Sequence, residues 1–367
     1  MAQNSRFNKE PAYQHGQAPK TAVILCNLGT PQAPQSKALR TYLAEFLSDP
    51  RVVEIPRWIW LIILHGIILR FRPSKSAKKY ALIWTPEGSP LKVWTQAQAQ
   101  SLQEKFSNAS EHVTVRYAMR YGQPNVPEVM DELKASGVTK VLVLPAYPQY
   151  SGTTTASVFD AFYNWSLKTR LIPEYRFINH YHDHPAYIEA LASRVQQHWR
   201  EHTQAPLLVM SFHGVPERTL MLGDPYHCEC YKTARLLAER LGLEPSQYKV
   251  TFQSRFGKAK WLEPYTEPTL RALAQSGTEH VDVICPGFTS DCLETLEEIN
   301  MEARHAFLNA GGKTFGYIPC LNDDPAGISA LAAVTQQHFG GWNTQAIPNA
   351  GVLAESRTAA LALGAKQ

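Results

Sequence analysis

Short apolar runs alternate with longer segments of helical length along almost the whole chain. Several runs are continuously apolar, which is typical of parallel strands covered on both faces. We predict strands at residues 22–27, 113–119, 140–146, 175–179, 207–212, 248–253, 281–285 and 314–318. Helices are expected at residues 96–106, 127–136, 186–202, 231–241 and 264–275. This alternation predicts an α/β fold of two similar Rossmann-like lobes, each a parallel sheet of about four strands flanked by helices, with a cleft between them.

The length of the chain, 367 residues, exceeds the size at which a single hydrophobic core usually divides. We expect a disordered tail at 1–20, an N-terminal lobe at 21–170 and a C-terminal lobe at 171–322. Residues 323–367 are expected to hold a C-terminal helix that packs back on the N-terminal lobe, and a tail. The polar N-terminus lacks an apolar signal segment, which predicts a cytoplasmic protein with six free thiols.

A net charge of +4 without any block of basic residues argues against nucleic-acid binding. It is compatible with an anionic small molecule or an acidic membrane surface. The most apolar segment, residues 56–70, is shorter than the roughly 20 residues that a membrane-spanning helix needs. Two interpretations stay open for it: a buried core helix, or an apolar lip at a ligand entrance or membrane interface.

The residues with the most chemical potential follow predicted strands directly. In parallel sheets, ligands bind outside the carboxyl ends of the strands. The segments at these ends are 27–31, 120–122, 147–155, 213–216, 254–255 and 286–294. Their clustering predicts one shared cleft. The chain has no GxGxxG, GxxxxGK[ST] or GxSxG pattern, which argues against a nucleotide enzyme or a standard hydrolase.

A regularly spaced set of acidic residues follows the strand predicted at 281–285. Asp291 is expected to open a helix, and Glu294, Glu298 and Glu302 follow at intervals of four, which places them on one helical face. This row is either a track for protons or a hard divalent cation, or a helix start with Asp291 and Glu294 as a capping box. His213, at the end of another apolar strand, can act beside Glu294 as a base or as a metal ligand.

Two further segments have both a structural and a functional interpretation. The hydroxyl run at 147–155 is either an N-cap series or an anion site at a helix N-terminus. Cys228 and Cys230 lie beside His227, but no second cysteine pair at zinc-ligand spacing accompanies them. We therefore do not expect a structural metal there.

Five motifs in order along the chain resemble one family. They are Tyr147-Pro-Gln-Tyr-Ser with its threonine run, Ser211-Phe-His-Gly-Val-Pro216, Gly223-Asp-Pro-Tyr226, Phe252-Gln-Ser-Arg-Phe-Gly257 and Phe288-Thr-Ser-Asp-Cys-Leu-Glu-Thr-Leu296. In these motifs the chain resembles the ferrochelatases, which insert Fe²⁺ into a porphyrin in the terminal step of haem synthesis. The resemblance runs from about Thr21 to Asp323.

The resemblance implies a role for individual residues. His213 and Glu294 match the family's catalytic histidine and glutamate, which are also its candidate metal ligands, and Glu298 and Glu302 match its acidic ladder. The implied porphyrin-binding positions are Leu28, Arg72, Tyr80, Ser89, Arg120, Tyr121 and Trp261. The implied substrates are protoporphyrin IX and Fe²⁺, and the implied enzyme class is a lyase.

The sequence departs from the family pattern at two places. Cys292 stands where many relatives carry a second histidine, and its thiol is a possible metal ligand. Members with a [2Fe–2S] cluster have a cysteine at the position of Gly152 and three more in the C-terminal tail. Here the tail after Cys320 has none, so we predict no cluster and no other cofactor.

Some alternatives remain open at the level of sequence. A cobalt or nickel chelatase acting on another tetrapyrrole, and a porphyrin or haem carrier without catalysis, are the competing functions. The sequence does not choose between protoporphyrin IX and coproporphyrin III, or between a monomer and a homodimer. Peripheral contact with the inner membrane rests on the apolar lip segment, which we extend to residues 56–90.

Overall fold

The computed structural model describes residues 7–8, 10–109, 112–257, 259–345 and 349–366. Its frame is two four-stranded parallel sheets, with strand orders β2-β1-β3-β4 and β6-β5-β7-β8. The strands of the first sheet are β1 (Lys20–Gly29), β2 (Val113–Tyr121), β3 (Val138–Pro145) and β4 (Glu174–Phe177). Those of the second are β5 (Leu208–His213), β6 (Tyr248–Gln253), β7 (His280–Ile284) and β8 (Thr314–Ile318). The predicted strands and the two-lobed α/β fold are confirmed.

The first sheet is buried on both faces because successive side chains of a strand point to opposite sides. In β1, Val23 and Leu25 join one core cluster, whereas Ala22 and Ile24 join another. The helix α4 (Pro90–Asn108) packs on the first side, and α5 (Val126–Ala135) and α6 (Ser157–Ser166) pack on the second. The continuous apolar run in β1 follows directly from this two-sided cover.

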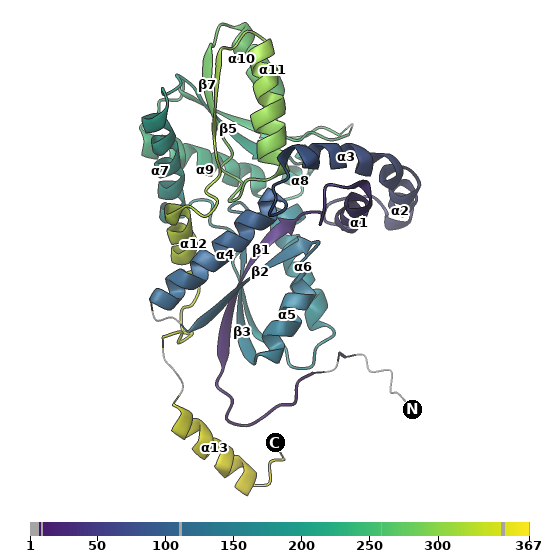
Figure 1. Cartoon of the computed structure of the whole chain (residues 1–367), viewed down its shortest axis with the longest axis vertical. Coiled ribbons are helices and arrows are strands. Elements are labelled where there is room, and N and C mark those ends of the chain that lie inside the picture. The colour runs from purple at the N-terminus through teal and green to yellow at the C-terminus, as the bar shows by residue number, and fades with distance from the viewer. Residues whose placement is uncertain (1–6, 9, 110–111, 258, 346–348, 367) are drawn as a thin grey trace.

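The second sheet is covered in the same way. On one side lie α7 (Pro185–Glu201), α9 (Tyr226–Leu241) and α12 (Pro325–Gln337). On the other lie α10 (Thr266–Gln275), η3 (Glu294–Ala303) and α11 (Arg304–Asn309). A short helix, α8 (Glu217–Met221), follows β5. Because α12 packs against both α7 and α4, it joins the two lobes (Figure 1).

An arm of helices extends from the first lobe between β1 and α4 (Figure 1). This arm consists of α1 (Ser36–Leu47), α2 (Arg57–Ile63), η1 (Leu64–Ile68) and α3 (Leu69–Ile83). Its side chains Trp58, Ile62 and Phe71 are 71%, 68% and 69% exposed. A core helix buried all round is therefore wrong for residues 56–70, and the arm presents an apolar outer face. Among the residues described, none of the helices has the length and apolar character needed to cross a bilayer.

The division of the chain differs in one respect from the expected boundary near residue 170. Strand β4 lies beyond that boundary, yet it pairs in parallel with β3 and completes the first sheet. The chain then crosses to the second lobe over residues 178–184, which we call the crossing segment. A short, half-exposed strand gives no pattern that shows which sheet it joins, so the sequence placed this boundary too early.

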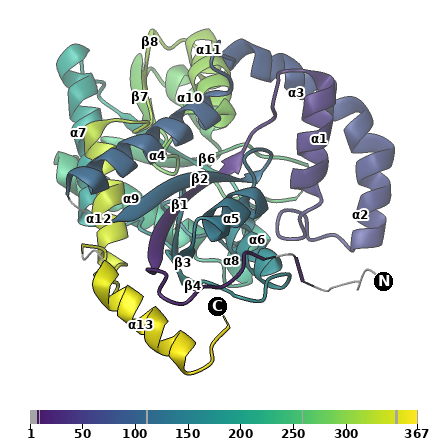
Figure 2. The same ribbon diagram turned by 60° about the horizontal axis from the view of Figure 1, so that its bottom comes forward.

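Helix α13 (Ala350–Ala362) lies at the same end of the molecule as the start of β1 (Figure 2). Residues 1–6 and 9 of the expected tail lie outside the described residues. Glu10, which is described, pairs with Lys134 and accepts a hydrogen bond from the amide of Arg170. Beyond α12, helix α13 (Ala350–Ala362) has no buried side chain, and its Leu353 backbone lies against Gly16.

Candidate functional site

His213 ends the buried strand β5 and is half-buried at its carboxyl edge. Its Nδ1 lies 2.6 Å from the carbonyl oxygen of Gly214. Because a carbonyl only accepts, the proton of a neutral imidazole is fixed on Nδ1, and Nε2 keeps the available lone pair. His213 therefore meets the geometric and chemical requirement for a base or a metal ligand.

Glu298 is held beside His213 by the loop that follows β6. The amide of Ser254 donates to Oε1 of Glu298 at 2.6 Å, and the Ser254 hydroxyl donates to Oε2 at 2.5 Å. Ser254 has a φ of 66°, which is uncommon for a residue other than glycine. The neighbouring Gln253 pairs in register with His213 and donates from Nε2 to the carbonyl oxygen of Glu294. Strands β5 and β6 and helix η3 thus converge on one point.

Burial is the largest influence on Glu298 and raises the pKa of its carboxyl group. The negative charge of Glu294 acts in the same direction, whereas the bonds from Ser254 and the charge of His213 oppose it. Glu298 therefore exchanges a proton more readily near neutral pH than an exposed glutamate does.

The helix that carries the acidic row is a π-helix from Glu294 to Ala303, and not the expected α-helix. In a π-helix, residues five apart lie one turn from each other. Accordingly, Lys79 of α3 contacts both Glu297 and Glu302, at 3.0 and 2.9 Å. Glu302 thus forms an ion pair with Lys79 on helix α3 of the arm. The expected row is therefore divided, because Glu298 interacts with Glu294 whereas Glu302 shares Lys79 with Glu297.

Asp291 does not cap this helix, because the residue at the N-cap is Leu293. The capping-box interpretation is therefore wrong. The buried carboxylate of Asp291 accepts hydrogen bonds from Tyr317, from the Thr295 hydroxyl and from the Asn322 amide group. Tyr317 belongs to β8 and Asn322 to the loop after it, so Asp291 anchors the start of η3 to the neighbouring strand.

Arg120 and Tyr121, expected on the opposite wall, are engaged within the first lobe. An Arg120 NH2 nitrogen lies 2.6 Å from Oδ2 of Asp49, and the Tyr121 hydroxyl donates to the same oxygen at 2.7 Å. The Ser157 hydroxyl donates to it as well, at 2.6 Å. Tyr121 is fully buried and packs among the core residues of the arm. In this structure Tyr121 therefore lies within the core of the arm and supports the expected porphyrin wall through its hydrogen bond to Asp49.

Of the remaining expected porphyrin positions, three belong to the arm and its junction with the first lobe, and Arg72 reaches the second lobe. Ser89 precedes α4 and accepts a hydrogen bond from Thr30, and buried Tyr80 interacts with the same threonine. Leu28 is partly buried against the core of the arm. The guanidinium of Arg72 lies 4.7 Å from the centre of the Phe256 ring, so it spans from α3 to the loop after β6.

Trp261 lies across the segment that follows His213. It forms an isolated bridge with Pro216, and its ring lies next to the α-carbon of Gly214. A β-carbon added to Gly214 would come within 2.6 Å of the Gln253 carbonyl oxygen, so a larger residue does not fit there. The indole nitrogen of Trp261 is buried and has no hydrogen-bond partner among the described residues.

Cys292 lies beside Glu294, and burial raises the pKa of its thiol well above the usual range. It is therefore a neutral thiol in the absence of a metal.

The two thiols of α9 differ in exposure, since Cys228 is exposed and Cys230 is buried. In the run at 147–155, Ser151 caps the helix η2 (Gly152–Ala156), and Asp224 accepts from the amide of Gly152. The expected anion position is thus filled by a carboxylate of the protein.

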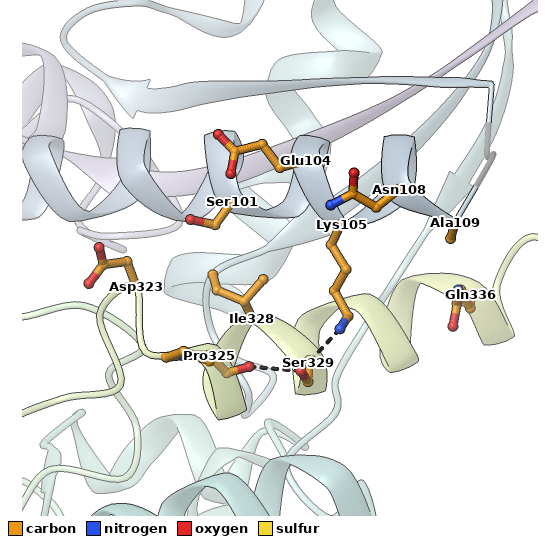
Figure 3. Close-up of a pocket in the computed structure, with 10 residues that line it drawn as sticks. All are labelled: Ser101, Glu104, Lys105, Asn108, Ala109, Asp323, Pro325, Ile328, Ser329 and Gln336. Atoms are coloured by element: carbon orange, nitrogen blue, oxygen red, sulfur yellow. Dashed lines mark hydrogen bonds between the residues drawn. The ribbon is translucent and has the colours of Figure 1, made fainter.

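The sequence reasoning missed the residues that hold the site. Asp49, Lys79 and Glu297 carried no motif, because their roles depend on elements that meet only in the fold. Ser254 was expected at a strand end, but its contact with Glu298 was not. A separate pocket of about 560 Å³ lies between α4 and α12, where Lys105 donates to Ser329, and contains none of the expected site residues (Figure 3).

Comparisons with known proteins agree with the sequence motifs. The family model described as Ferrochelatase matches residues 20–339. A Ferrochelatase of Polaromonas sp. (strain JS666) is 67% identical, and the match covers 98% of this chain and 99% of the relative. A Ferrochelatase of Methylibium petroleiphilum is 63% identical, with 97% and 98% covered. These matches extend over both lobes.

A solved structure shares the fold. It is SirB from Bacillus subtilis with Fe³⁺, which superimposes with a TM-score of 0.50 at 12% identity, over 89% of this chain and 99% of SirB. The family model and the relatives span the five sequence motifs and both sheets. This chain therefore belongs to the ferrochelatase family.

Proposed function

We propose that this chain inserts Fe²⁺ into protoporphyrin IX to form protohaem and release two protons. The observation that carries this proposal is the Nε2 lone pair of His213 at the carboxyl end of β5, in electrostatic contact with the buried carboxyl group of Glu298 on η3. Membership in the ferrochelatase family, over nearly the full length of its relatives, supports the same reaction. A carrier without catalysis would have no use for this group of bases.

His213 is the residue that we assign to proton removal. A free-base porphyrin loses two pyrrolic protons when it accepts a divalent metal. The Nε2 atom of His213 takes a proton because Nδ1 is already committed to the Gly214 carbonyl. Glu294 lies next in line and either receives that proton or contacts the incoming Fe²⁺. Its main-chain carbonyl accepts a hydrogen bond from Gln253, the residue that pairs in register with His213.

Glu298 continues this path away from the ring. Its raised pKa suits a group that accepts and then releases a proton near neutral pH. Beyond it, the cluster of Lys79, Glu297 and Glu302 offers carboxylate oxygens at the surface between α3 and η3. We assign Glu302 to this outer cluster, and Asp291 to holding η3 in place.

The porphyrin is proposed to lie between the arm and the second lobe. Leu28 and Trp261 would face its apolar surface, and Arg72 would meet a propionate. Tyr80, Ser89, Arg120 and Tyr121 support this wall through their hydrogen bonds. Binding at these positions provides the free energy that bends the ring toward the geometry in which a metal enters.

We further propose a cytoplasmic enzyme without a cofactor, whose arm contacts the inner membrane peripherally. The exposed side chains Trp58, Ile62 and Phe71 support this contact, since aromatic and aliphatic groups suit the lipid interface. A monomer and a homodimer both suit the proposal.

The function is tested with purified protein under anaerobic conditions. Protoporphyrin IX and Fe²⁺ are mixed, and the loss of free-base fluorescence is followed. We expect His213→Ala to lower turnover about 10²–10⁴-fold, because a positioned general base contributes this much. Its dissociation constant for porphyrin should stay unchanged.

The control is His305→Ala, which removes an exposed imidazole on α11. It should retain full turnover. Undiminished turnover in His213→Ala would contradict the assigned role, and porphyrin binding without insertion of Fe²⁺, Zn²⁺ or Co²⁺ by the parent protein would contradict the function.

A further inference from the structure

The crossing segment contributes two imidazoles to a cluster outside the site described above. His180 and His182 lie between β4 and α7, and Glu229 lies in the first turn of α9. The Nδ1 atom of His180 is 2.7 Å from Oε1 of Glu229. The Nδ1 atom of His182 is 3.2 Å from Oε2 of the same carboxylate. One candidate ligand atom from each residue lies within 4.8 Å of the other two.

Hydrogen bonding alone does not account for this cluster. The side chain of His182 is only 6% exposed, and its Nδ1 has no hydrogen-bond partner among the described residues. The carboxylate of Glu229 is only 7% exposed, and its ion pairs within the described residues are with these two imidazoles. A buried ring nitrogen therefore points at a buried carboxylate without bonding to it, an arrangement that costs free energy unless a third group lies between them.

We propose that His180, His182 and Glu229 bind a divalent transition-metal ion. Two imidazole nitrogens and one carboxylate oxygen are a donor set that suits Zn²⁺, Fe²⁺ and Co²⁺. The unpartnered Nδ1 of His182 supplies a lone pair, and His180 is 50% exposed, which gives the ion a path from solvent. Three protein ligands leave at least one coordination position for water.

Surrounding groups already orient these ligands. The amide of Tyr150 donates to Oε2 of Glu229 at 2.7 Å, and the Thr233 hydroxyl donates to the carbonyl of His182 at 2.8 Å. On the far side of the ring, Nε2 of His182 faces the carboxylate of Asp183, which is itself paired with Lys232. Carboxylates and carbonyls behind a ligating histidine are the usual supports of a metal site.

The position of the cluster indicates what the ion would do. Glu229 belongs to the second lobe, Tyr150 belongs to the loop after β3, and the two histidines belong to the segment that joins the lobes. An ion bound there would tie these three parts together, next to the helix start where Asp224 holds Ser151 and Gly152. It would brace the loop at 147–155 without touching His213 or Glu294.

The test uses the full chain carrying His213→Ala and Glu294→Gln, so that the active-site ligands are removed. Co²⁺ is the probe, and its binding is measured by equilibrium dialysis and by the visible absorption of the bound ion. We expect one equivalent of Co²⁺ to remain bound. Adding His180→Ala or His182→Gln should weaken binding at least about tenfold. Adding His305→Ala or Cys228→Ser should leave it unchanged.

A second measurement covers the case in which His182→Gln does not fold. His180 is half-exposed, so His180→Ala should keep the far-UV circular dichroism of the parent. Co²⁺ should raise the melting temperature of the active-site double variant, but not that of the same chain with His180→Ala. Absence of Co²⁺ binding in the double variant, or binding that only Cys228→Ser removes, would overturn the proposal. Because no outcome depends on iron insertion, it fails or holds separately from the proposed function.

Discussion

Glu298 shows how one residue combines a structural cost with a chemical use. Its carboxyl group is largely buried, and it receives two hydrogen bonds from Ser254. Those bonds favour the charged form, but burial and the charge of Glu294 disfavour it more strongly, so its pKa is raised. A proton relay needs this balance, because a fully stabilised carboxylate would not accept a proton near neutral pH.

The raised pKa predicts a pH-dependent stability for Glu298→Gln. A carboxyl whose pKa is raised in the folded state stabilises the fold below its ordinary pKa of 4.5, and this contribution is lost as the pH rises through the folded value. Glutamine does not titrate and keeps an oxygen for the Ser254 amide. We therefore expect a higher melting temperature than the parent at pH 7–8, and no advantage at pH 4. A melting temperature below that of the parent at pH 8 would contradict this assignment.

The same substitution predicts a kinetic effect. Glu298→Gln should slow metal insertion at least about tenfold at neutral pH, because the proposed path from His213 loses one of its proton acceptors. Porphyrin affinity should not change, since Glu298 is not placed against the ring. Stopped-flow insertion rates across pH and Fe²⁺ concentration measure the effect. Unchanged rates at every pH and concentration would reduce Glu298 to a structural residue.

At the scale of elements, the π-helix η3 decides which carboxylates act together. The sequence spacing of four residues predicted one row on an α-helix. The observed helix brings Glu297 and Glu302 to Lys79, whereas Glu298 interacts with both His213 and Glu294. No local sequence pattern predicts a π-helix. Its wider turn is less favourable than that of an α-helix, so it forms only where surrounding contacts stabilise it. The anchoring of Asp291 to Tyr317 and Asn322 supplies such contacts at its start.

Lys79 provides the test at this scale. Lys79→Met should destabilise the protein by about 1–3 kcal/mol, because it leaves the buried carboxylate of Glu297 without its donor. Urea unfolding at pH 7.5 measures the change. The matched control is Lys75→Met, an exposed position on the same helix, which should shift stability by less than about 0.5 kcal/mol. Equal effects of the two substitutions would show that the contact between α3 and η3 adds no stability.

At the scale of the whole molecule, α4 connects the lobes through one buried side chain. Nε2 of Gln98 donates to the carbonyl oxygens of Thr289 and Asn322, at 2.9 and 2.8 Å. The Ser290 hydroxyl donates back to Oε1 of Gln98. These partners flank the start of η3, so the first lobe helps to hold the helix that carries Glu294 and Glu298.

Gln98→Leu should therefore loosen the junction between the lobes. We expect a loss of about 1–3 kcal/mol of stability for each carbonyl left without a donor. Porphyrin should bind more weakly, because the two walls of the cleft lose their common support. Gln100→Leu, which alters an exposed position on the same helix, is the control. Calorimetry measures the melting temperature and titration measures porphyrin affinity. If Gln98→Leu and Gln100→Leu both matched the parent in these two quantities, the role of Gln98 at the junction between the lobes would be contradicted.

The sequence by itself determined the eight strands, the two-lobed class and the family. Strands buried on both faces need continuous apolar runs. Because this requirement is local, β1 and β5 could be predicted from the sequence alone. His213 and Glu294 could be predicted for the same reason, since each follows a strand and carries its own motif.

The tertiary structure alone decided which side chains meet. The strand β4 joined the first sheet, Tyr121 turned inward to Asp49, and Lys79 reached Glu297 across the lobes. The cluster of His180, His182 and Glu229 also brings together residues about 50 positions apart in sequence. Such contacts depend on packing between elements, and no periodicity along the chain encodes them.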